Sequence, residues 1–424
     1  MDIQPIAAKD RNLGSVDYFL LWAGVAISLA EIWAGGFLAP MGLGMGIWAI
    51  LLGHLIGNTL MGLGGMIGST HGIPSMVSIR PAFGLRGADI AAVLNIIQLI
   101  GWAAIMLIIG GQAGAMLGAQ AGGLLADSRF WVVTIGMGTL LWALCTGRPL
   151  WKVLQNTSVV ALLFIVVLMT WVSMRELGQS ALPPKGSGIP FMIGLDLVIA
   201  MPISWLPLVA DYSRFSRRTG PAFWSTWWGY FIVSSWMYVI GLSATLVTGD
   251  TDPAMLLLTM MGKIGLAVPA LILVIFSTIT SDFPDIYSAT CSMLNISRRL
   301  KARTLMWIAG LLSIALALVF PPEQYENFLL FIGAMFIPLF GVVLTDYFIL
   351  RKQRIDLREI YRVGGAYWYW NGFNVAAVAA WAVGFGVFEL IAVMKYPVGG
   401  SLPGMAAAGG LYWILTRVQA RKTP

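Results

Sequence analysis

Long apolar runs separated by short polar breaks follow one another along the whole chain. A bilayer core about 30 Å thick is crossed by roughly 20 helical residues, and runs of about that length recur from end to end. The pattern therefore predicts an all-α integral membrane protein with twelve transmembrane helices, at Val16–Gly36, Leu43–Gly68, Ile90–Gly118, Phe130–Gly147, Gln155–Met174, Phe191–Ala210, Phe223–Val247, Gly265–Asn295, Leu305–Phe320, Glu326–Leu350, Gly372–Met394 and Leu402–Thr416. No separate water-soluble domain is expected.

Composition supports a lipid environment. The 424 residues are 58% hydrophobic and only 11% charged, whereas soluble domains average roughly 25% charged residues. Water is therefore excluded as the main solvent, and the lipid bilayer is the first partner to expect.

The distribution of basic residues predicts the topology. With the N-terminus in the cytoplasm, the predicted helices place all but five of the 26 Lys and Arg residues on the cytoplasmic side, as the positive-inside bias requires. The five exceptions are Arg129, Arg175, Lys185, Lys263 and Lys395. We therefore expect both termini to be cytoplasmic in a bacterial inner membrane. The net charge of +7 is explained by this topology, and no nucleic-acid partner is expected. The polar segment before Val16 has no cleavable signal pattern.

Cysteine and histidine are too scarce for redox or metal chemistry. Cys145 and Cys291 both fall at predicted cytoplasmic helix ends, where a structural disulfide is not expected. His54 and His71 have no metal-ligand spacing. The sequence thus predicts no cofactor and no enzyme.

Polar side chains inside the apolar spans are the functional candidates, because burying them in lipid is costly. They concentrate in the first, third, sixth and eighth predicted helices. These residues are Ser28, Glu31, Asn95, Gln98, Trp102, Ser204, Trp205, Ser277, Thr278, Thr280, Ser281, Asp282, Asp285 and Tyr287.

Two of these helices are expected to be interrupted. The first contains a glycine-rich patch, Trp33-Ala34-Gly35-Gly36, and the sixth contains Pro202 and Pro207, which remove helical hydrogen bonds. Interrupted helices five apart favour a five-plus-five inverted repeat, a common plan of secondary transporters. We expect a cytoplasmic segment at 1–15, repeats at 16–180 and 181–350, two further helices at 351–418 and a cytoplasmic tail at 419–424.

Motifs along the chain carry a family resemblance. They are Trp33-Ala34-Gly35-Gly36, Gly101-Trp102, the segment from Ala210 to Phe215, Thr280-Ser281-Asp282, and the segment from Ile337 to Tyr347. Together they resemble the nucleobase-cation symport family of cytosine, purine, allantoin and hydantoin permeases, most closely its bacterial hydroxymethylpyrimidine permeases. The resemblance implies a leucine-transporter-like fold with two peripheral helices. It also implies import of a pyrimidine, with hydroxymethylpyrimidine as the first choice and another nucleobase, allantoin or hydantoin as the alternative.

The resemblance also assigns a substrate site. Trp102 matches the family's stacking tryptophan. The family's second aromatic residue aligns without gaps with Pro202, and Trp205, three residues later, is preferred for that role. Met106 stands where the family often has a glutamine, so Gln98, one turn earlier, is the available amide. The remaining candidates for substrate contact are Glu31, Trp33, Ser204 and Asp282.

The coupling ion is expected to be Na⁺ or H⁺. The resemblance implies a sodium site formed by carbonyls of Gly24 and of Ile27 or Ser28, and by hydroxyls of Ser277, Thr280 and Ser281. The three hydroxyl residues occupy one helix face, and oxygen ligands suit a small hard cation. The alternative is that each hydroxyl bonds a carbonyl of its own helix.

The carboxylates leave several roles open. Glu31 is expected to bond an aminopyrimidine, to carry a proton, or to cap free amides. Asp282 and Asp285 would repel each other if both were ionised, so proton coupling stays open. Asp211 and Arg214 are expected to form a structural or gating ion pair.

An alternating-access symporter, acting as a monomer, is the preferred function. An integral-membrane enzyme and a channel are the remote alternatives. The sequence supplies neither a metal cluster nor a nucleophile and base for the enzyme, and it shows no repeated pore lining for the channel.

Overall fold

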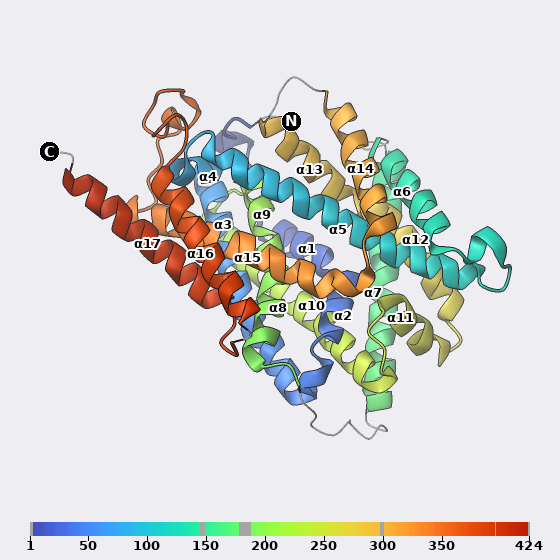
Figure 1. The fold of residues 1–424 in the computed structure, drawn as a ribbon. Helices are drawn as coiled ribbons and strands as arrows, with labels where there is room; N and C mark the ends of the chain where they lie inside the picture. Colours follow the sequence, from blue (N-terminus) through green and yellow to red (C-terminus); the bar gives the residue numbers. More distant parts are fainter. Residues whose placement is uncertain (1–2, 145–148, 178–187, 297–300, 395, 423–424) are drawn as a thin grey trace.

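The computed structural model describes residues 3–144, 149–177, 188–296, 301–394 and 396–422, and all long elements in these ranges are helices (Figure 1). In chain order they are α1 (Ser15–Ala26), α2 (Leu29–Gly36), α3 (Leu43–His71), α4 (Ser75–Phe83), α5 (Gly87–Gly118), α6 (Ser128–Leu144), α7 (Pro149–Leu177), α8 (Phe191–Ser204), α9 (Leu206–Ser213), α10 (Thr219–Thr248), α11 (Pro253–Gly262), α12 (Ala267–Ser281), α13 (Phe283–Ile296), α14 (Ala302–Val319), α15 (Tyr325–Leu344), α16 (Val375–Val393) and α17 (Ser401–Lys422).

The all-helical membrane fold is confirmed. Nine helical segments in the described ranges are long and apolar enough to cross a bilayer, and α1 with α2 forms a tenth as a bent pair. The other two predicted spans are also helical, as α6 and α17. Helix α6 has only 17 residues, and its predicted end at Gly147 lies outside the described residues. Helix α17 carries Arg417, Arg421 and Lys422 in its last turns.

Both predicted helix interruptions are present. Helices α1 and α2 meet at a bend of 58°, where Ile27 and Ser28 leave the helical conformation. Helices α8 and α9 are separated by Trp205, between Pro202 and Pro207. The predicted span Gly265–Asn295 is present as the 30-residue span Ala267–Ile296, with a one-residue interruption at Asp282 between α12 and α13. Pro284 explains this break, since proline is tolerated in the first turn of a new helix but not in a helix interior.

Two long helices, α5 and α10, each pack against several other helices. Figure 1 shows α5 running across the molecule. Helix α10 packs against α1, α2 and α3, whereas α5 packs against α6, α12, α13 and α14. Buried aromatic and aliphatic side chains fill the spaces between them, including Trp22, Tyr230, Tyr238, Tyr325 and Phe336.

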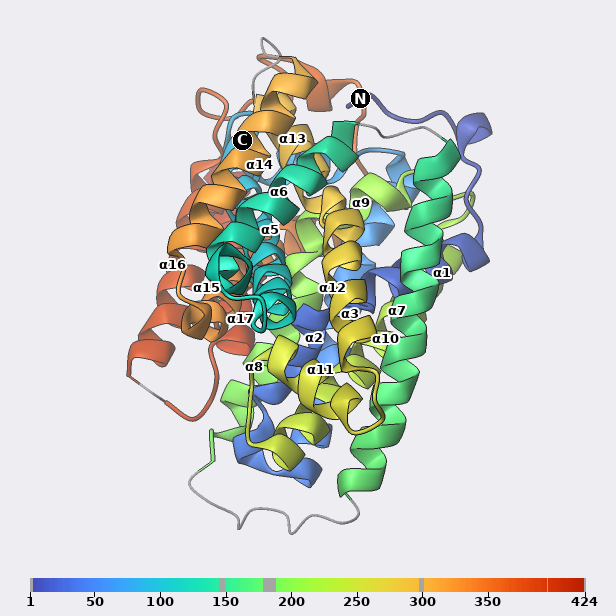
Figure 2. The ribbon, with the colours of Figure 1, turned by 90° about the vertical axis from the view of Figure 1, so that its right-hand side faces the viewer.

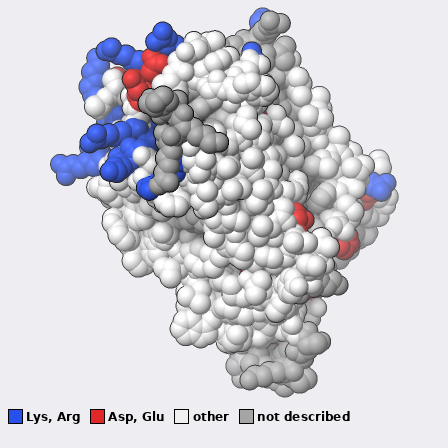
Figure 3. Space-filling view, turned by 60° about the vertical axis from the view of Figure 1, so that its left-hand side comes forward, with Lys and Arg blue, Asp and Glu red and all other residues white. Residues whose placement is uncertain are grey.

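The two ends of the chain lie toward the same end of the bundle (Figure 2). On the face drawn in Figure 3, Lys and Arg side chains gather near one end. Most of the rest of this face carries neither basic nor acidic side chains. This arrangement agrees with a wide apolar belt that faces lipid.

Glycines allow α2 and α10 to pack with their backbones in contact. A Cβ atom on Gly35 would lie 2.2 Å from the carbonyl oxygen of Tyr238, and one on Gly241 would lie 1.9 Å from that of Ile32. Neither position has room for a side chain, and small residues are how membrane helices approach this closely. The first interrupted helix is thereby fixed against α10.

We predict that Gly241→Ala destabilises the protein, because the new methyl group would overlap a backbone atom that cannot rotate away. Overpacking of this kind typically costs about 1–3 kcal/mol, which should appear as a lower unfolding midpoint of the purified protein in detergent. Gly220→Ala is the matched control on the same helix, since nothing lies within 4 Å of a Cβ there. Equal midpoints for the two variants would contradict the proposed contact.

Candidate substrate and cation site

One side of α5 carries the residues around which the candidate site is arranged. Gln98, Trp102, Met106 and Gly110 follow one another at intervals of four residues, so they form a stripe that winds slowly around the helix. We call them the α5 stripe. Each member contacts a different helix, and these contacts bring the predicted site residues together.

Gln98 connects α5 to the break in the sixth span. Its Nε2 donates to the carbonyl oxygen of Ser204 at 2.9 Å and to Asn95 Oδ1 at 2.8 Å. Both amide hydrogens are therefore used. The Oε1 atom is buried and has no partner among the described residues, which leaves an acceptor inside the bundle.

Trp102 lies in an aromatic cluster. Its ring meets Tyr325 edge-on at 5.9 Å and Phe328 edge-on at 5.4 Å between ring centroids. Trp33, the other predicted aromatic contact, lies 4.6 Å from the Tyr325 ring. The indole Nε1 of Trp102 is buried without a partner in the described part of the chain. Trp102 thus offers a buried donor one helical turn after Gln98 on the same helix.

Trp205 belongs to a second aromatic group. It is the residue between α8 and α9, and its ring meets Trp22 edge-on at 5.7 Å. Its Nε1 donates to the hydroxyl of Tyr230 at 3.1 Å. The preceding residue, Ser204, donates its hydroxyl to the carbonyl of Met201 at 2.6 Å. The break therefore has its side chains fixed by neighbouring groups.

Both chain segments that carry the predicted sodium ligands meet the α5 stripe. Ser28, in the break between α1 and α2, contacts Met106, with Oγ 3.8 Å from the sulfur. On α12, Thr278 packs on Gly110, where an added Cβ would lie 3.2 Å from the threonine hydroxyl. Since Met106 and Gly110 are one helical turn apart, the α1–α2 break and α12 approach the same stretch of α5.

The predicted cation ligands already form hydrogen bonds with nearby backbone groups. The carbonyl of Gly24 accepts from the Ile27 amide at 3.3 Å, and Ser28 Oγ accepts from the Ala30 amide at 3.2 Å. Thr280 donates to the carbonyls of Phe276 and Ser277, at 3.2 and 3.1 Å.

Ser277 donates in the same way to the carbonyl of Val274 at 3.0 Å. Thr280 and Ser277 therefore bond their own helix, as the alternative interpretation expects, and a hydroxyl that donates in this way still has lone pairs for a cation. The side chain of Ser281 lies outside the described part of the chain, so that member of the predicted set stays a prediction.

Asp282 is the polar group least accounted for by the protein. It occupies the break between α12 and α13 and is 0% exposed, and both carboxylate oxygens lack a partner among the described residues. Asp285, one turn later, is partly buried. A buried carboxyl without a partner is costly and indicates a role other than structural support.

Glu31 points toward α10. Its Oε1 accepts from the Tyr230 hydroxyl at 2.6 Å, and its Oε2 accepts from the Ser234 hydroxyl at 2.7 Å. Ser234 Oγ also lies 2.5 Å from His54 Nε2. Glu31 is only 3% exposed, so a buried polar chain links α2, α10 and α3.

Tyr230 and Ser234 are not among the site residues predicted from the sequence. Neither residue is charged, and each lies in an apolar run, so neither has a distinctive signal in the sequence. Their spacing was the available signal, because Tyr230, Ser234 and Tyr238 lie four residues apart on one face of α10.

Asp211 and Arg214 lie near the end of α9. Asp211 Oδ1 accepts from the backbone amide of Ser75 at 2.9 Å, while Ser75 Oγ accepts from the amides of Ala210 and Asp211 at 3.0 and 3.2 Å. Asp211 thus binds the start of α4. The guanidinium of Arg214 lies 5.0 Å from the ring centroid of Phe215. The predicted ion pair of Asp211 and Arg214 stays a prediction.

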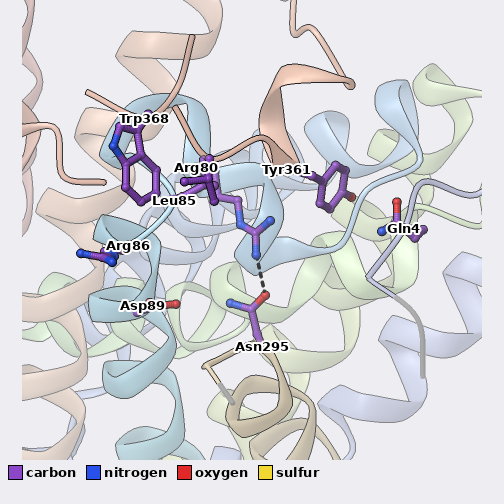
Figure 4. Close-up of a pocket in the computed structure, with 9 residues that line it drawn as sticks. Gln4, Arg80, Leu85, Arg86, Asp89, Asn295, Tyr361 and Trp368 are labelled. Carbon is purple, nitrogen blue, oxygen red and sulfur yellow. Dashed lines mark hydrogen bonds between the residues drawn. The ribbon is translucent and has the colours of Figure 1, made fainter. Parts of the chain in front are cut away.

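A surface pocket opens beside the start of α5 (Figure 4). It is lined by Gln4, Arg80, Leu85, Arg86, Asp89, Asn295, Tyr361, Val363 and Trp368. Arg80 donates to Asn295 Oδ1 at 3.1 Å, and its guanidinium lies 5.4 Å from the ring centroid of Tyr361. None of the predicted substrate or cation residues lines this pocket, so it is a separate feature of the surface.

Comparisons with known proteins agree on one family. A family model described as "Permease for cytosine/purines, uracil, thiamine, allantoin" matches residues 5–415. The cytosine permease of Escherichia coli (strain K12) is 26% identical over 433 residues, covering 99% of this chain and 94% of that protein. The hydantoin permease of Microbacterium maritypicum is 25% identical over 429 residues, covering 93% of this chain and 85% of that protein.

A solved structure has the same fold. The inward-facing conformation of Mhp1 superposes with a TM-score of 0.87 at 20% sequence identity, covering 99% of this chain and 94% of that one. The leucine-transporter-like fold implied by the sequence resemblance is thereby confirmed. The proteins that match in sequence and structure are permeases and a transporter, not enzymes.

We predict that Tyr230→Phe lowers stability, because Glu31 Oε1 and Trp205 Nε1 would both lose a buried partner. Leaving such groups unpaired costs about 1–3 kcal/mol, measured as a lower unfolding midpoint in detergent. Tyr238→Phe is the matched control. Both tyrosines are 0% exposed on α10, but the Tyr238 hydroxyl has no partner among the described residues, so its loss should be neutral or stabilising. A larger loss at position 238 than at 230 would refute the network.

Proposed function

The chain belongs to the family of permeases for cytosine/purines, uracil, thiamine and allantoin, and from this membership we propose that it imports a pyrimidine by symport with a cation. Hydroxymethylpyrimidine is the proposed substrate. Cytosine, another nucleobase, allantoin or a hydantoin is the alternative. The cycle is alternating access around a mid-membrane site, with a monomer as the working unit and both termini in the cytoplasm.

One observation supports a substrate of this general kind. The acceptor Gln98 Oε1 and the donor Trp102 Nε1 are both buried on α5, and both lack a partner among the described residues. Buried polar groups in proteins are normally hydrogen-bonded. A flat heterocycle with an amino group and ring nitrogens would supply an N–H for Gln98 and an acceptor for Trp102, and its ring faces suit an aromatic surround.

The proposed cation lies at the α1–α2 break, next to α12. The break frees backbone carbonyls, which can replace the hydration shell of an ion. Gly24, Ile27 or Ser28 and Ser277, Thr280 and Ser281 are the proposed ligands of Na⁺. Asp282 and Asp285 lie directly after these hydroxyls on the chain, and their carboxyls keep H⁺ as the alternative coupling ion at this site.

We predict that Trp102→Ala weakens substrate binding roughly 10- to 100-fold, since stacking of a base on an aromatic ring contributes about 1–3 kcal/mol. Thermal shift of the purified protein with hydroxymethylpyrimidine, cytosine, purines, allantoin and hydantoins selects the ligand, and radiolabelled uptake into proteoliposomes measures transport. Trp171→Ala is the control, because Trp171 is 54% exposed on α7. Unchanged affinity in Trp102→Ala would remove Trp102 from the site, and no uptake of any compound in the panel would refute the substrate class.

We predict that an inward sodium gradient stimulates uptake and that Thr280→Val abolishes the stimulation, because valine keeps the shape of threonine but removes the proposed ligand. Thr290→Val is the matched control: Thr290 is also buried and donates to its own helix, to the carbonyl of Ile286 at 2.9 Å. Uptake should be measured with and without sodium at equal osmolarity. Sodium stimulation that survives in Thr280→Val would place the cation elsewhere.

A further inference from the structure

Three buried side chains, which we call the proton trio, form a continuous hydrogen-bonded chain between α2, α10 and α3. Glu31 Oε2 lies 2.7 Å from Ser234 Oγ, which lies 2.5 Å from His54 Nε2. His54 Nδ1 lies 2.9 Å from the carbonyl oxygen of Ile50. The exposed fraction is 3% for Glu31 and 0% for Ser234 and His54. None of the proposed sodium ligands belongs to the proton trio.

The hydrogen atoms of the trio can be counted from the bonding partners. A carbonyl oxygen only accepts, so His54 Nδ1 must carry a hydrogen. Ser234 has a single hydroxyl hydrogen but two neighbours, Glu31 Oε2 and His54 Nε2, each of which accepts when it is not protonated. Both contacts are hydrogen bonds only if one further proton is present, on Glu31 or on His54.

Two arrangements satisfy this count. In the first, Glu31 Oε2–H donates to Ser234 Oγ, and the Ser234 hydroxyl donates to neutral His54. In the second, the Ser234 hydroxyl donates to the Glu31 carboxylate, and Nε2–H of a protonated His54 donates to Ser234 Oγ. Passing from the first to the second breaks the Oε2–H bond and forms an Oγ–H bond, while the original Oγ–H bond breaks and an Nε2–H bond forms. The net charge is zero in both.

The other proton counts are unfavourable at a buried site. Without the extra proton, the carboxylate and the bare Nε2 would face one hydroxyl hydrogen, and the trio would carry a charge of −1. With two extra protons, the Ser234 hydroxyl would have no acceptor within the trio, and the charge would be +1. An isolated buried charge is strongly disfavoured, so a single proton is the stable occupancy.

The helices that carry the trio supply no compensating cation. Helices α2, α3 and α10 contain no Lys or Arg. The ionisable side chains that face Glu31 are the tyrosines 230, 238 and 325; Tyr230 donates to Glu31, and Tyr325 donates to the Ala30 carbonyl at 3.0 Å.

The acidic groups of the other helices that pack against the trio are placed elsewhere. Asp17, Asp89 and Glu326 lie in the first turns of α1, α5 and α15, and Asp196 on α8 accepts from the amides of Gly400 and Ser401. Asp211 on α9 accepts from the Ser75 amide. At the end of α7, Glu176 pairs with Lys263 and Arg175 lies over the Trp171 ring. The proton must therefore be held by the trio itself.

We propose that Glu31, Ser234 and His54 form a binding site for one proton, which is exchanged during the transport cycle. This proton site is additional to the proposed symport function, and its exchange during transport rests on that function. The link to the substrate site is Tyr230, which donates to Glu31 Oε1 and accepts from Trp205 Nε1 at the α8–α9 break. Rearrangement of that break therefore alters the bonding of the carboxyl that holds the proton.

The protonation of His54 can be measured directly by NMR, because the chain has only two histidines. In protein labelled with ¹⁵N-histidine, His71→Gln leaves His54 as the single imidazole, and the ¹⁵N shifts report the protonation of each ring nitrogen. The expected spectrum has a protonated Nδ1 and an Nε2 in a strong hydrogen bond. Ser234→Ala should shift Nε2 toward a free neutral imidazole, and Ser234→Thr, which keeps the hydroxyl, should not.

A bare Nδ1, or an Nε2 signal identical in the parent protein and in Ser234→Ala, would overturn the site. The signal of the parent protein decides this even if Ser234→Ala does not fold. This measurement needs no substrate, so its result is independent of the proposed function.

The transport role is tested in proteoliposomes with radiolabelled hydroxymethylpyrimidine and equal sodium on both sides. An inside-alkaline proton gradient should drive accumulation in the parent protein and in Ser234→Thr, and Ser234→Ala should lose this accumulation. Counterflow, which needs no gradient, should persist in the parent protein and in Ser234→Thr, which keeps the hydroxyl. Counterflow without any response to the proton gradient in the parent protein would overturn the proton role and leave the proposed function intact. Absence of counterflow in the parent protein would instead count against the proposed substrate.

Discussion

The hydrocarbon core of a bilayer offers no hydrogen-bond partner, so a polar group inside the bundle must be paired by the protein or by what the protein binds. The interrupted helices depend on this constraint. At the α1–α2 break, Ser28 Oγ accepts from the Ala30 amide, and the Tyr325 hydroxyl of α15 donates to the Ala30 carbonyl. At the α8–α9 break, Gln98 of α5 binds the Ser204 carbonyl. These two breaks are therefore each hydrogen-bonded by a helix distant in the sequence.

The fold was largely predictable because lipid imposes a simple rule on sequence. Apolar runs of the required length gave the twelve helical segments, and prolines and glycines located the first two breaks. The break at Asp282 was missed, although Pro284 is the residue that marks it, because the surrounding run of hydroxyl residues continued the helical pattern. The short helices α4 and α11 were missed for a different reason: at 9 and 10 residues they are too short to appear as spans.

The candidate site was predictable only where one helix carries it. Gln98 and Trp102 share a face of α5, and that spacing can be read from sequence alone. The partners of Glu31 cannot be found in this way, because Tyr230 and Ser234 come from α10 and His54 from α3. A serine or a tyrosine in an apolar run has no distinctive pattern of its own. Its importance depends on which helix packs opposite, and packing is decided by the close approach of glycines such as Gly35 and Gly241.

The α8–α9 break is bound from two sides, and this limits how a substrate can enter. Gln98 on α5 binds the carbonyl of Ser204, while Tyr230 on α10 accepts from the indole of Trp205, the next residue. Moving the break away from α5 must break the first bond, and moving it away from α10 must break the second. To accept a hydrogen bond from the Gln98 amide, an acceptor atom of the substrate would have to displace the Ser204 carbonyl or the Asn95 side chain. A substrate N–H can bind Gln98 Oε1 without displacing either group, so an amino edge facing α5 is the orientation that preserves the break.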